Sequence, residues 1–129
     1  MRKNLILDTC ALIWLTTGDK MLSPEAVEAI EVAPFVYVSP ISAWEISHKI
    51  ARHKIRWPLP PQEWFFKVVA KHILHILPLS VELLVKANEL PWHHRDPADR
   101  FIIAGAVLND LTIVTRDRLF QDYGVPLLS

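Results

Sequence analysis

The chain has 129 residues, 51% of them hydrophobic, and its 14 Lys and Arg balance its 14 Asp and Glu. A single domain of this size can bury a core without a metal or disulfide staple, and one cysteine, Cys10, excludes an internal disulfide framework. The apolar runs are far shorter than the roughly 20 residues needed to cross a bilayer, so we expect no membrane partner. A lone thiol and no visible export signal predict a cytoplasmic protein.

Apolar runs and capping residues predict strands that alternate with helices. In the first half they predict, in order, a strand over 4–7, a helix over 9–16, a helix over 26–32 after the start signal Ser23-Pro24-Glu25, a strand over 35–39 and a helix from Pro40 to about His53. In the second half they predict a helix over 62–71 after the proline-rich break at 57–61, a strand over 73–79, helices over 81–90 and 97–109, a strand over 111–115, a short helical turn around 119–120 and an edge strand over 126–128.

Parallel strands need crossover connections, which this alternation supplies. We therefore expect one α/β domain over residues 1–129, with a short central parallel sheet flanked by helices on both faces. No linker, internal repeat or low-complexity tract divides the chain.

Acidic residues stand where the predicted strands end. Asp8 follows the first strand, Asp117 follows the strand over 111–115, and Glu45 lies about one turn into the helix after the second strand. Asp96 and Asp99 flank the start of the helix over 97–109. Sites in open α/β sheets lie beyond the carboxyl ends of the strands. A rim of carboxylates suits a hard cation such as Mg²⁺ or Mn²⁺, and phosphodiester cleavage is the chemistry that such a site favours.

Each acid also has a purely structural explanation. Asp8 can cap the helix after it, although an acid that ends an apolar strand is costly to bury without a partner, which favours a functional role. Glu45 can pair with Lys49 at the i+4 spacing, and spacing alone does not choose between that pair and a metal. Capping explains Asp96 better than ligation does, and for Asp99 and Asp117 the two explanations are balanced.

Four blocks carry a resemblance to a known family. They are Leu7-Asp8-Thr9-Cys10-Ala11-Leu12-Ile13-Trp14, Ser39-Pro40-Ile41-Ser42-Ala43-Trp44-Glu45-Ile46, His94-Arg95-Asp96-Pro97-Ala98-Asp99-Arg100 followed by Ile103-Ala104, and Ile113-Val114-Thr115-Arg116-Asp117. In this order they make the chain resemble the PIN-domain ribonucleases, and most closely the VapC-type toxins of bacterial toxin–antitoxin pairs.

The resemblance implies a set of site residues. It makes Asp8, Glu45, Asp99 and Asp117 the metal-binding and catalytic acids, with Asp96 as an auxiliary acid. It also implies Mg²⁺ or Mn²⁺ as cofactor, RNA as substrate, a homodimer, and inhibition by a cognate antitoxin. Thr9 and Thr115 stand beside ligands in the matching motifs and are predicted to orient a carboxylate or a water. Arg100 is expected to pair with an acid or to contact a phosphate.

The middle of the chain is basic. Residues 46–81 carry six Lys and Arg against one Glu, so the zero net charge hides a basic segment between acid-rich flanks. We predict that RNA phosphates contact Lys49, Arg52, Lys54 and Arg56, and that Trp57 stacks on a base. The alternative is a solvated helix end whose cations offset the helix dipole.

Other candidate features have structural explanations. His72, His75, His93 and His94 lack the convergent ligands of a zinc site and are expected to be surface or structural residues. Cys10 is expected to be a buried thiol. The aromatic run 64–66 is expected to serve as core, or as a dimer or antitoxin groove.

The sequence therefore predicts a metal-dependent endoribonuclease in which a metal-activated water attacks an RNA phosphodiester. One alternative is a catalytically silent scaffold that keeps the fold and binds only RNA or protein. Another is a phosphatase with Asp8 as nucleophile, which Cys10 argues against because that chemistry usually places a second Asp at this position.

Overall fold

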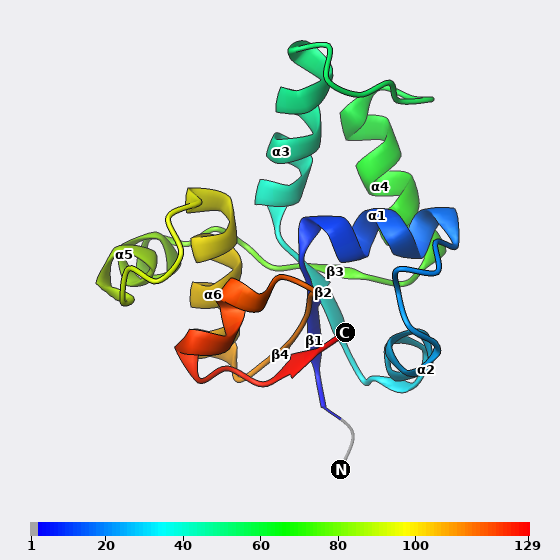
Figure 1. The fold of residues 1–129 in the computed structure, drawn as a ribbon. Coiled ribbons are helices and arrows are strands. Elements are labelled where there is room, and N and C mark those ends of the chain that lie inside the picture. Colours follow the sequence, from blue (N-terminus) through cyan, green and yellow to red (C-terminus); the bar gives the residue numbers. More distant parts are fainter. Residues whose placement is uncertain (1–2) are drawn as a thin grey trace.

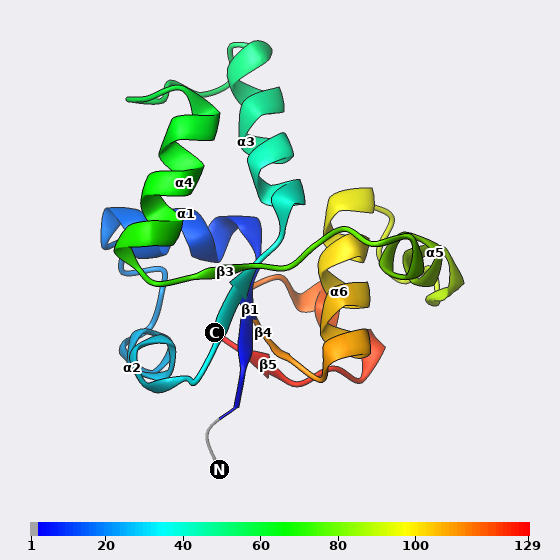
Figure 2. The same ribbon diagram turned by 180° about the vertical axis from the view of Figure 1, so that it is seen from behind.

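A computed structural model describes residues 3–129 and shows a five-stranded parallel sheet with helices on both faces, as the sequence predicts (Figures 1 and 2). The elements are, in chain order, β1 (Leu5–Leu7), α1 (Thr9–Thr17), α2 (Pro24–Val32), β2 (Val36–Val38), α3 (Pro40–Ala51), α4 (Pro61–Lys71), β3 (His75–Ile76), α5 (Val81–Glu89), α6 (Pro97–Asn109), β4 (Thr112–Val114), the 3₁₀ helix η1 (Arg118–Tyr123) and β5 (Leu127–Leu128). The strand order is β3-β2-β1-β4-β5.

The two faces of the sheet build separate halves of the core. Leu5 and Leu7 of β1 pack with α1, α2, α3 and α4, whereas Ile6 between them packs with α5, α6 and η1. The same alternation occurs in β4, where Val114 joins the first cluster and Ile113 the second. This two-residue period follows from the pleat, and burial on both faces explains why the strands read as continuous apolar runs.

Side-chain caps fix where most helices begin. Asp8, Ser23, Ser39, Ser80 and Asp96 each accept a backbone N–H in the first turn of the helix that follows. Several of these helices also carry proline at their first position, where no backbone donor is needed. These signals are local, so the sequence locates the helix starts well.

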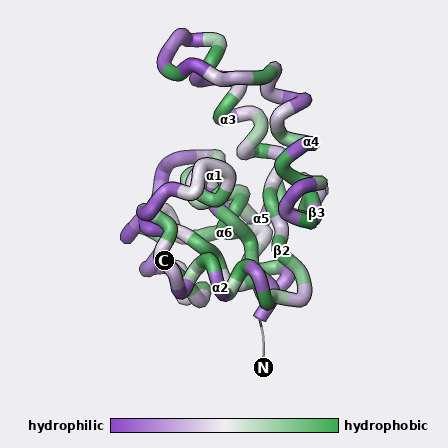
Figure 3. Tube along the Cα trace, turned by 90° about the vertical axis from the view of Figure 1, so that its right-hand side faces the viewer, coloured by the Kyte–Doolittle hydropathy of each residue, from purple (hydrophilic) through white to green (hydrophobic). Residues whose placement is uncertain are grey.

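The predicted ends are less accurate. The strand predicted over 73–79 is only His75–Ile76, and the helix predicted to reach His53 ends at Ala51, with His53 in a left-handed conformation. Helices α3 and α4 form a hairpin that extends away from the sheet, and the loop that joins them carries strongly hydrophilic residues (Figure 3). No helix in residues 3–129 is both long enough and apolar enough to cross a membrane.

Gly105 lets α6 approach its neighbours closely. A Cβ at this position would lie 2.7 Å from Cδ2 of Leu77 and 3.4 Å from Cδ1 of Leu83. A longer side chain at this position would not fit without a shift of Leu77 and Leu83.

Candidate functional site

The structure brings the predicted acids to the carboxyl edge of the sheet. Asp8 directly follows β1, Asp117 follows β4, and Glu45 lies in the second turn of α3, which begins just after β2. Asp99 lies in the first turn of α6. The charges of Asp96, Glu45, Asp8 and Asp117 all act on the Asp99 carboxyl, so the five acids share one electrostatic environment.

Asp8 is buried and held from two sides. Its Oδ1 accepts the Ala11 N–H at 2.7 Å, which caps α1, and its carboxylate is hydrogen-bonded to the Thr115 side chain. Burial nevertheless raises the pKa of Asp8 above its ordinary value, and the charge of Asp117 raises it further. The helix cap and the proposed metal role are therefore compatible, because capping uses one face of the carboxylate.

Glu45 is tied to α1 rather than to Lys49. The Thr9 hydroxyl donates to Glu45 Oε1 at 2.5 Å and lies 2.8 Å from the Ser42 hydroxyl. Burial raises the pKa of Glu45, while the Thr9 hydrogen bond and the charge of Lys49 oppose that rise. Among residues 3–129, Glu45 and Lys49 form no ion pair, so the structural alternative weighed for Glu45 does not occur.

Thr9 and Thr115 each contact acids, in the positions where an orienting role was predicted. Thr9 binds Glu45, and Thr115 links two acids because its hydroxyl also accepts the Asp117 N–H at 3.0 Å. Hydrogen bonds of this kind fix the orientation of carboxylates that ligate a cation.

Asp99 and Asp117 meet at a histidine. The Nε2 atom of His94 lies 3.0 Å from Oδ2 of Asp99 and 3.0 Å from Oδ2 of Asp117. Ligand atoms of these three side chains all lie within 4.8 Å of one another. The expectation that His94 is a surface or structural residue does not include this contact with two acids.

Crowding strongly perturbs Asp99. Its pKa is raised from 3.8 to about 8, first by burial and then by the charges of Asp96, Glu45, Asp8 and Asp117. Asp96 itself is exposed and caps α6 through the Ala98 N–H at 2.9 Å. Carboxylates forced together in this way favour a proton or a cation between them, so an all-oxygen donor set of this kind fits Mg²⁺ or Mn²⁺.

Arg100 serves a different purpose from the two that were predicted. Its guanidinium is buried, donates to the carbonyls of Ala87, Leu90, Pro91 and His94 at 2.5–3.0 Å, and stacks on the Trp92 ring at 3.6 Å. Among residues 3–129 it forms no ion pair with an acid, and its side chain is buried away from solvent, so the prediction of an acid or phosphate partner is wrong. Arg100 instead fixes the segment that carries His94.

We expect Arg100→Met to destabilise the protein. The exchange leaves buried carbonyls at the end of α5 and in the loop after it without donors, which costs about 3 kcal/mol or more. Urea denaturation measures the loss. The control is Arg95→Met, which alters an exposed arginine of the same loop and should change the free energy of unfolding by less than about 0.5 kcal/mol. Equal stability of Arg100→Met and wild type would contradict the assignment.

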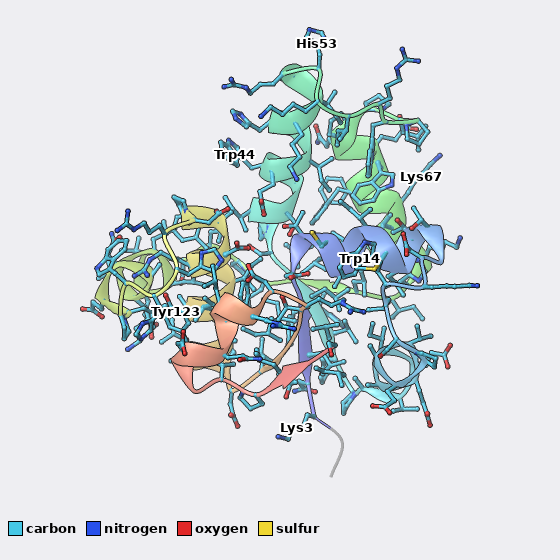
Figure 4. All side chains as sticks on the ribbon, in the orientation of Figure 1. Lys3, Trp14, Trp44, His53, Lys67 and Tyr123 are labelled. Carbon is cyan, nitrogen blue, oxygen red and sulfur yellow. The ribbon has the colours of Figure 1, made fainter. Side chains whose placement is uncertain are left out.

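Most of the predicted RNA-binding residues lie away from the acids. Lys49 and Arg52 follow Glu45 at the i+4 and i+7 positions and so share its side of α3. Lys54 and Arg56 are exposed beyond the end of α3, at the tip of the hairpin, where Figure 4 labels the adjacent His53.

Trp57 is partly buried beside the core. Its ring packs edge-to-face on Trp64 at 4.9 Å and its indole nitrogen is buried, so stacking on a base, which stays a prediction, could use only the exposed part of the ring. Trp64 and Phe65 belong to the core, as one of the expectations for this run proposed, whereas Phe66 is exposed.

The prediction that Cys10 is a buried thiol is wrong, because Cys10 is exposed. Partial desolvation, followed by the charge of Asp8, raises the pKa of its thiol. A thiol with a raised pKa is a poor nucleophile at neutral pH.

The fold and the site together define an α/β protein with an acidic cluster at the carboxyl edge of a parallel sheet. The model of one family, the PIN domain, matches residues 5–126. The chain therefore belongs to the PIN domain family.

Known proteins agree with that membership. The chain is 28% identical over 124 residues to Ribonuclease VapC22 of Mycobacterium tuberculosis, covering 95% of this chain and 94% of that protein. Its fold is similar to that of a chain in VapBC2 from Rickettsia felis bound to a promoter DNA fragment, with a TM-score of 0.71, 16% identity and coverage of 98% and 97%. A toxin–antitoxin complex from Klebsiella pneumoniae gives a TM-score of 0.65, 23% identity and coverage of 97% and 96%.

Proposed function

We propose that this protein is a divalent-metal-dependent endoribonuclease and the toxin of a type II toxin–antitoxin pair. The observation that carries the proposal is the set of acids around Asp99: its Oδ2 and that of Asp117 both lie 3.0 Å from His94 Nε2, and burial, followed by the charges of Asp96, Glu45, Asp8 and Asp117, raises the pKa of Asp99 to about 8. The relative named as a ribonuclease spans nearly the whole chain, which supports RNA as the substrate.

In this proposal Asp8, Glu45, Asp99 and Asp117 hold Mg²⁺ or Mn²⁺, and Asp96 adds negative charge at the rim. A bound cation supplies an activated water and neutralises charge on the phosphodiester. The chain's own part is to keep the carboxylates fixed: Thr9 orients Glu45, Thr115 links Asp8 to Asp117, and the helix caps hold the backbone around them.

RNA cleavage by the purified protein tests the proposal. We expect cleavage of an unstructured RNA in Mn²⁺ or Mg²⁺, its loss in EDTA, and its return when excess Mn²⁺ is added. EDTA-resistant cleavage, equal in wild type and Asp8→Asn, would contradict it. Calorimetric titration with Mn²⁺ distinguishes the proposed nuclease from the catalytically silent scaffold, because the scaffold would show no metal binding that depends on the acids. A phosphoenzyme trapped on Asp8 would instead favour the phosphatase alternative.

The positive side chains that follow Glu45 along α3 are proposed to contact the RNA backbone. Removing two phosphate contacts from single-stranded RNA lowers the slope of log affinity against log salt by about 1.4. We therefore expect Lys49→Ala/Arg52→Ala to weaken RNA binding and reduce the slope by this amount, measured with Asp8→Asn also present so that RNA stays intact. The matched control, Lys3→Ala/Lys20→Ala, removes two exposed lysines elsewhere and should leave the slope unchanged. A similar effect in both pairs would refute a specific RNA surface on α3.

The relatives support the proposed antitoxin partner. Solved structures with this fold include toxin–antitoxin complexes, which supports a cognate antitoxin that binds the toxin and suppresses cleavage. We also propose a homodimer, which light scattering at known concentration tests, and a cytoplasmic location, where a ribonuclease meets its RNA.

A further inference from the structure

Contacts to both its backbone and its ring hold His94 in place. Its side chain is 8% exposed, and its ring meets the Phe120 ring edge-on at 5.5 Å. Its backbone N–H donates to the Tyr123 hydroxyl at 2.7 Å, and its carbonyl accepts from buried Arg100 at 3.0 Å. Both the backbone and the ring therefore have one fixed position.

The hydrogen bonds also fix which ring nitrogen carries the hydrogen. The backbone N–H of Asp96 donates to Nδ1 at 3.2 Å, so Nδ1 acts as an acceptor and the neutral ring carries its hydrogen on Nε2. That N–H is hydrogen-bonded to Oδ2 of Asp117 at 3.0 Å, and Oδ2 of Asp99 lies at the same distance of 3.0 Å from Nε2. A nitrogen that already carries a hydrogen cannot ligate a metal.

The contact occupies one oxygen of each acid. The other oxygen of Asp117 accepts the Leu119 N–H at 2.9 Å. Among residues 3–129, no hydrogen bond reaches Oδ1 of Asp99, which stays available to a cation. His94 therefore orients two carboxylates from elements far apart in sequence, α6 and the segment after β4, without taking a ligand position itself.

We propose that His94 is a positioning residue that holds Asp117 beside Asp99 through its Nε2–H and so raises the affinity of the acidic site for Mn²⁺ or Mg²⁺. This inference rests on the proposed metal site. Partners that orient ligands in this way are typically worth 10- to 100-fold in metal affinity.

Two substitutions separate this role from support of the local fold. In His94→Gln the amide nitrogen lies near the position of Nε2 and can still donate to the acids, but the acceptor for Asp96 is lost. In His94→Asn the amide oxygen lies near the position of Nδ1 and can still accept from Asp96, but the donor to the acids is lost. We expect calorimetric Mn²⁺ affinity within about 3-fold of wild type for Gln and at least about 10-fold weaker for Asn. The opposite order would indicate support of the loop alone and overturn the proposal.

Electron spin-echo modulation of bound Mn²⁺ provides the second readout. We expect the spectrum of the wild type to show no ¹⁴N directly coordinated to Mn²⁺. A strong coupling to imidazole nitrogen that disappears in both variants would show that His94 is a ligand and would overturn the proposal. The two possible failures can be told apart. If the wild type does not bind Mn²⁺, the proposed metal site itself is refuted. If the wild type binds Mn²⁺ and His94→Asn binds it with the same affinity, only the role of His94 is refuted.

Discussion

Asp8→Asn is expected to lower the rate of RNA cleavage by about 1,000-fold, which corresponds to about 4 kcal/mol of lost transition-state stabilisation. Asp8 is the acid at the end of the central strand β1, and its carboxylate is buried beside Thr115. Asparagine has the same shape but lacks the negative charge that a cation requires. Initial rates of cleavage at saturating Mn²⁺ measure the effect.

The fold of this variant should survive. The amide oxygen of asparagine can accept the Ala11 N–H that now caps α1, and asparagine is a good cap. Removing a carboxyl whose pKa is already raised by burial also relieves a desolvation cost. Asp19→Asn is the matched control, since Asp19 is exposed and accepts the Met21 N–H in a surface turn. Cleavage at the wild-type rate by Asp8→Asn would remove Asp8 from the site.

Asp99→Asn is expected to stabilise the protein when no divalent metal is present. The pKa of Asp99 is about 8 in the folded protein against 3.8 for the free side chain, so between these values the folded state keeps a proton that the unfolded state has lost. The folded state then binds more protons, and the free energy of unfolding falls as pH rises from about 4 to 8. Burial raises the pKa values of Asp8 and Glu45 in the same direction.

Asparagine has no proton to lose, so the substitution removes the part of this pH dependence that Asp99 contributes. Near pH 8 we expect Asp99→Asn to be more stable than metal-free wild type by several kcal/mol, with about 5 kcal/mol as the upper limit set by the rise in pKa from 3.8 to about 8, and we expect this gain to disappear near pH 4. Urea denaturation in EDTA at both pH values measures it, with Asp122→Asn as the exposed control. Added Mn²⁺ should make the wild type the more stable of the two proteins, because the metal binds and stabilises only the wild type. Equal pH dependence in wild type and Asp99→Asn would contradict the crowding at this carboxyl.

Local signals explain why so much of the fold follows from the sequence. The helix starts depend on a cap and a proline next to each other, as at Ser23-Pro24 and Asp96-Pro97, and the structure uses both. The strands are apolar on both faces because helices cover both, so continuous runs identify them. The strand at His75–Ile76 is shorter than predicted because its length depends on pairing with β2 at the sheet edge, which local sequence does not determine.

Only part of the site can be predicted from the sequence, because some of its residues depend on how distant segments pack together. Asp8 and Asp117 follow strands whose carboxyl ends coincide in any parallel sheet, so their proximity is predictable. The roles of His94, Arg100 and Trp57 depend on which surfaces pack together. His94 stands two residues before the cap of an acid-bearing helix, and that spacing is the one signal that could have directed attention to it.

A crystal structure of the protein soaked in Mn²⁺, with anomalous scattering to locate the metal, tests the central claim most directly. We predict a Mn²⁺ peak at the carboxyl edge of the sheet, ligated by oxygens of Asp8, Glu45, Asp99 and Asp117 directly or through water, with His94 Nε2 outside bonding distance. A peak elsewhere, or no peak at this edge at millimolar Mn²⁺, would contradict the proposed metal site and the mechanism built on it.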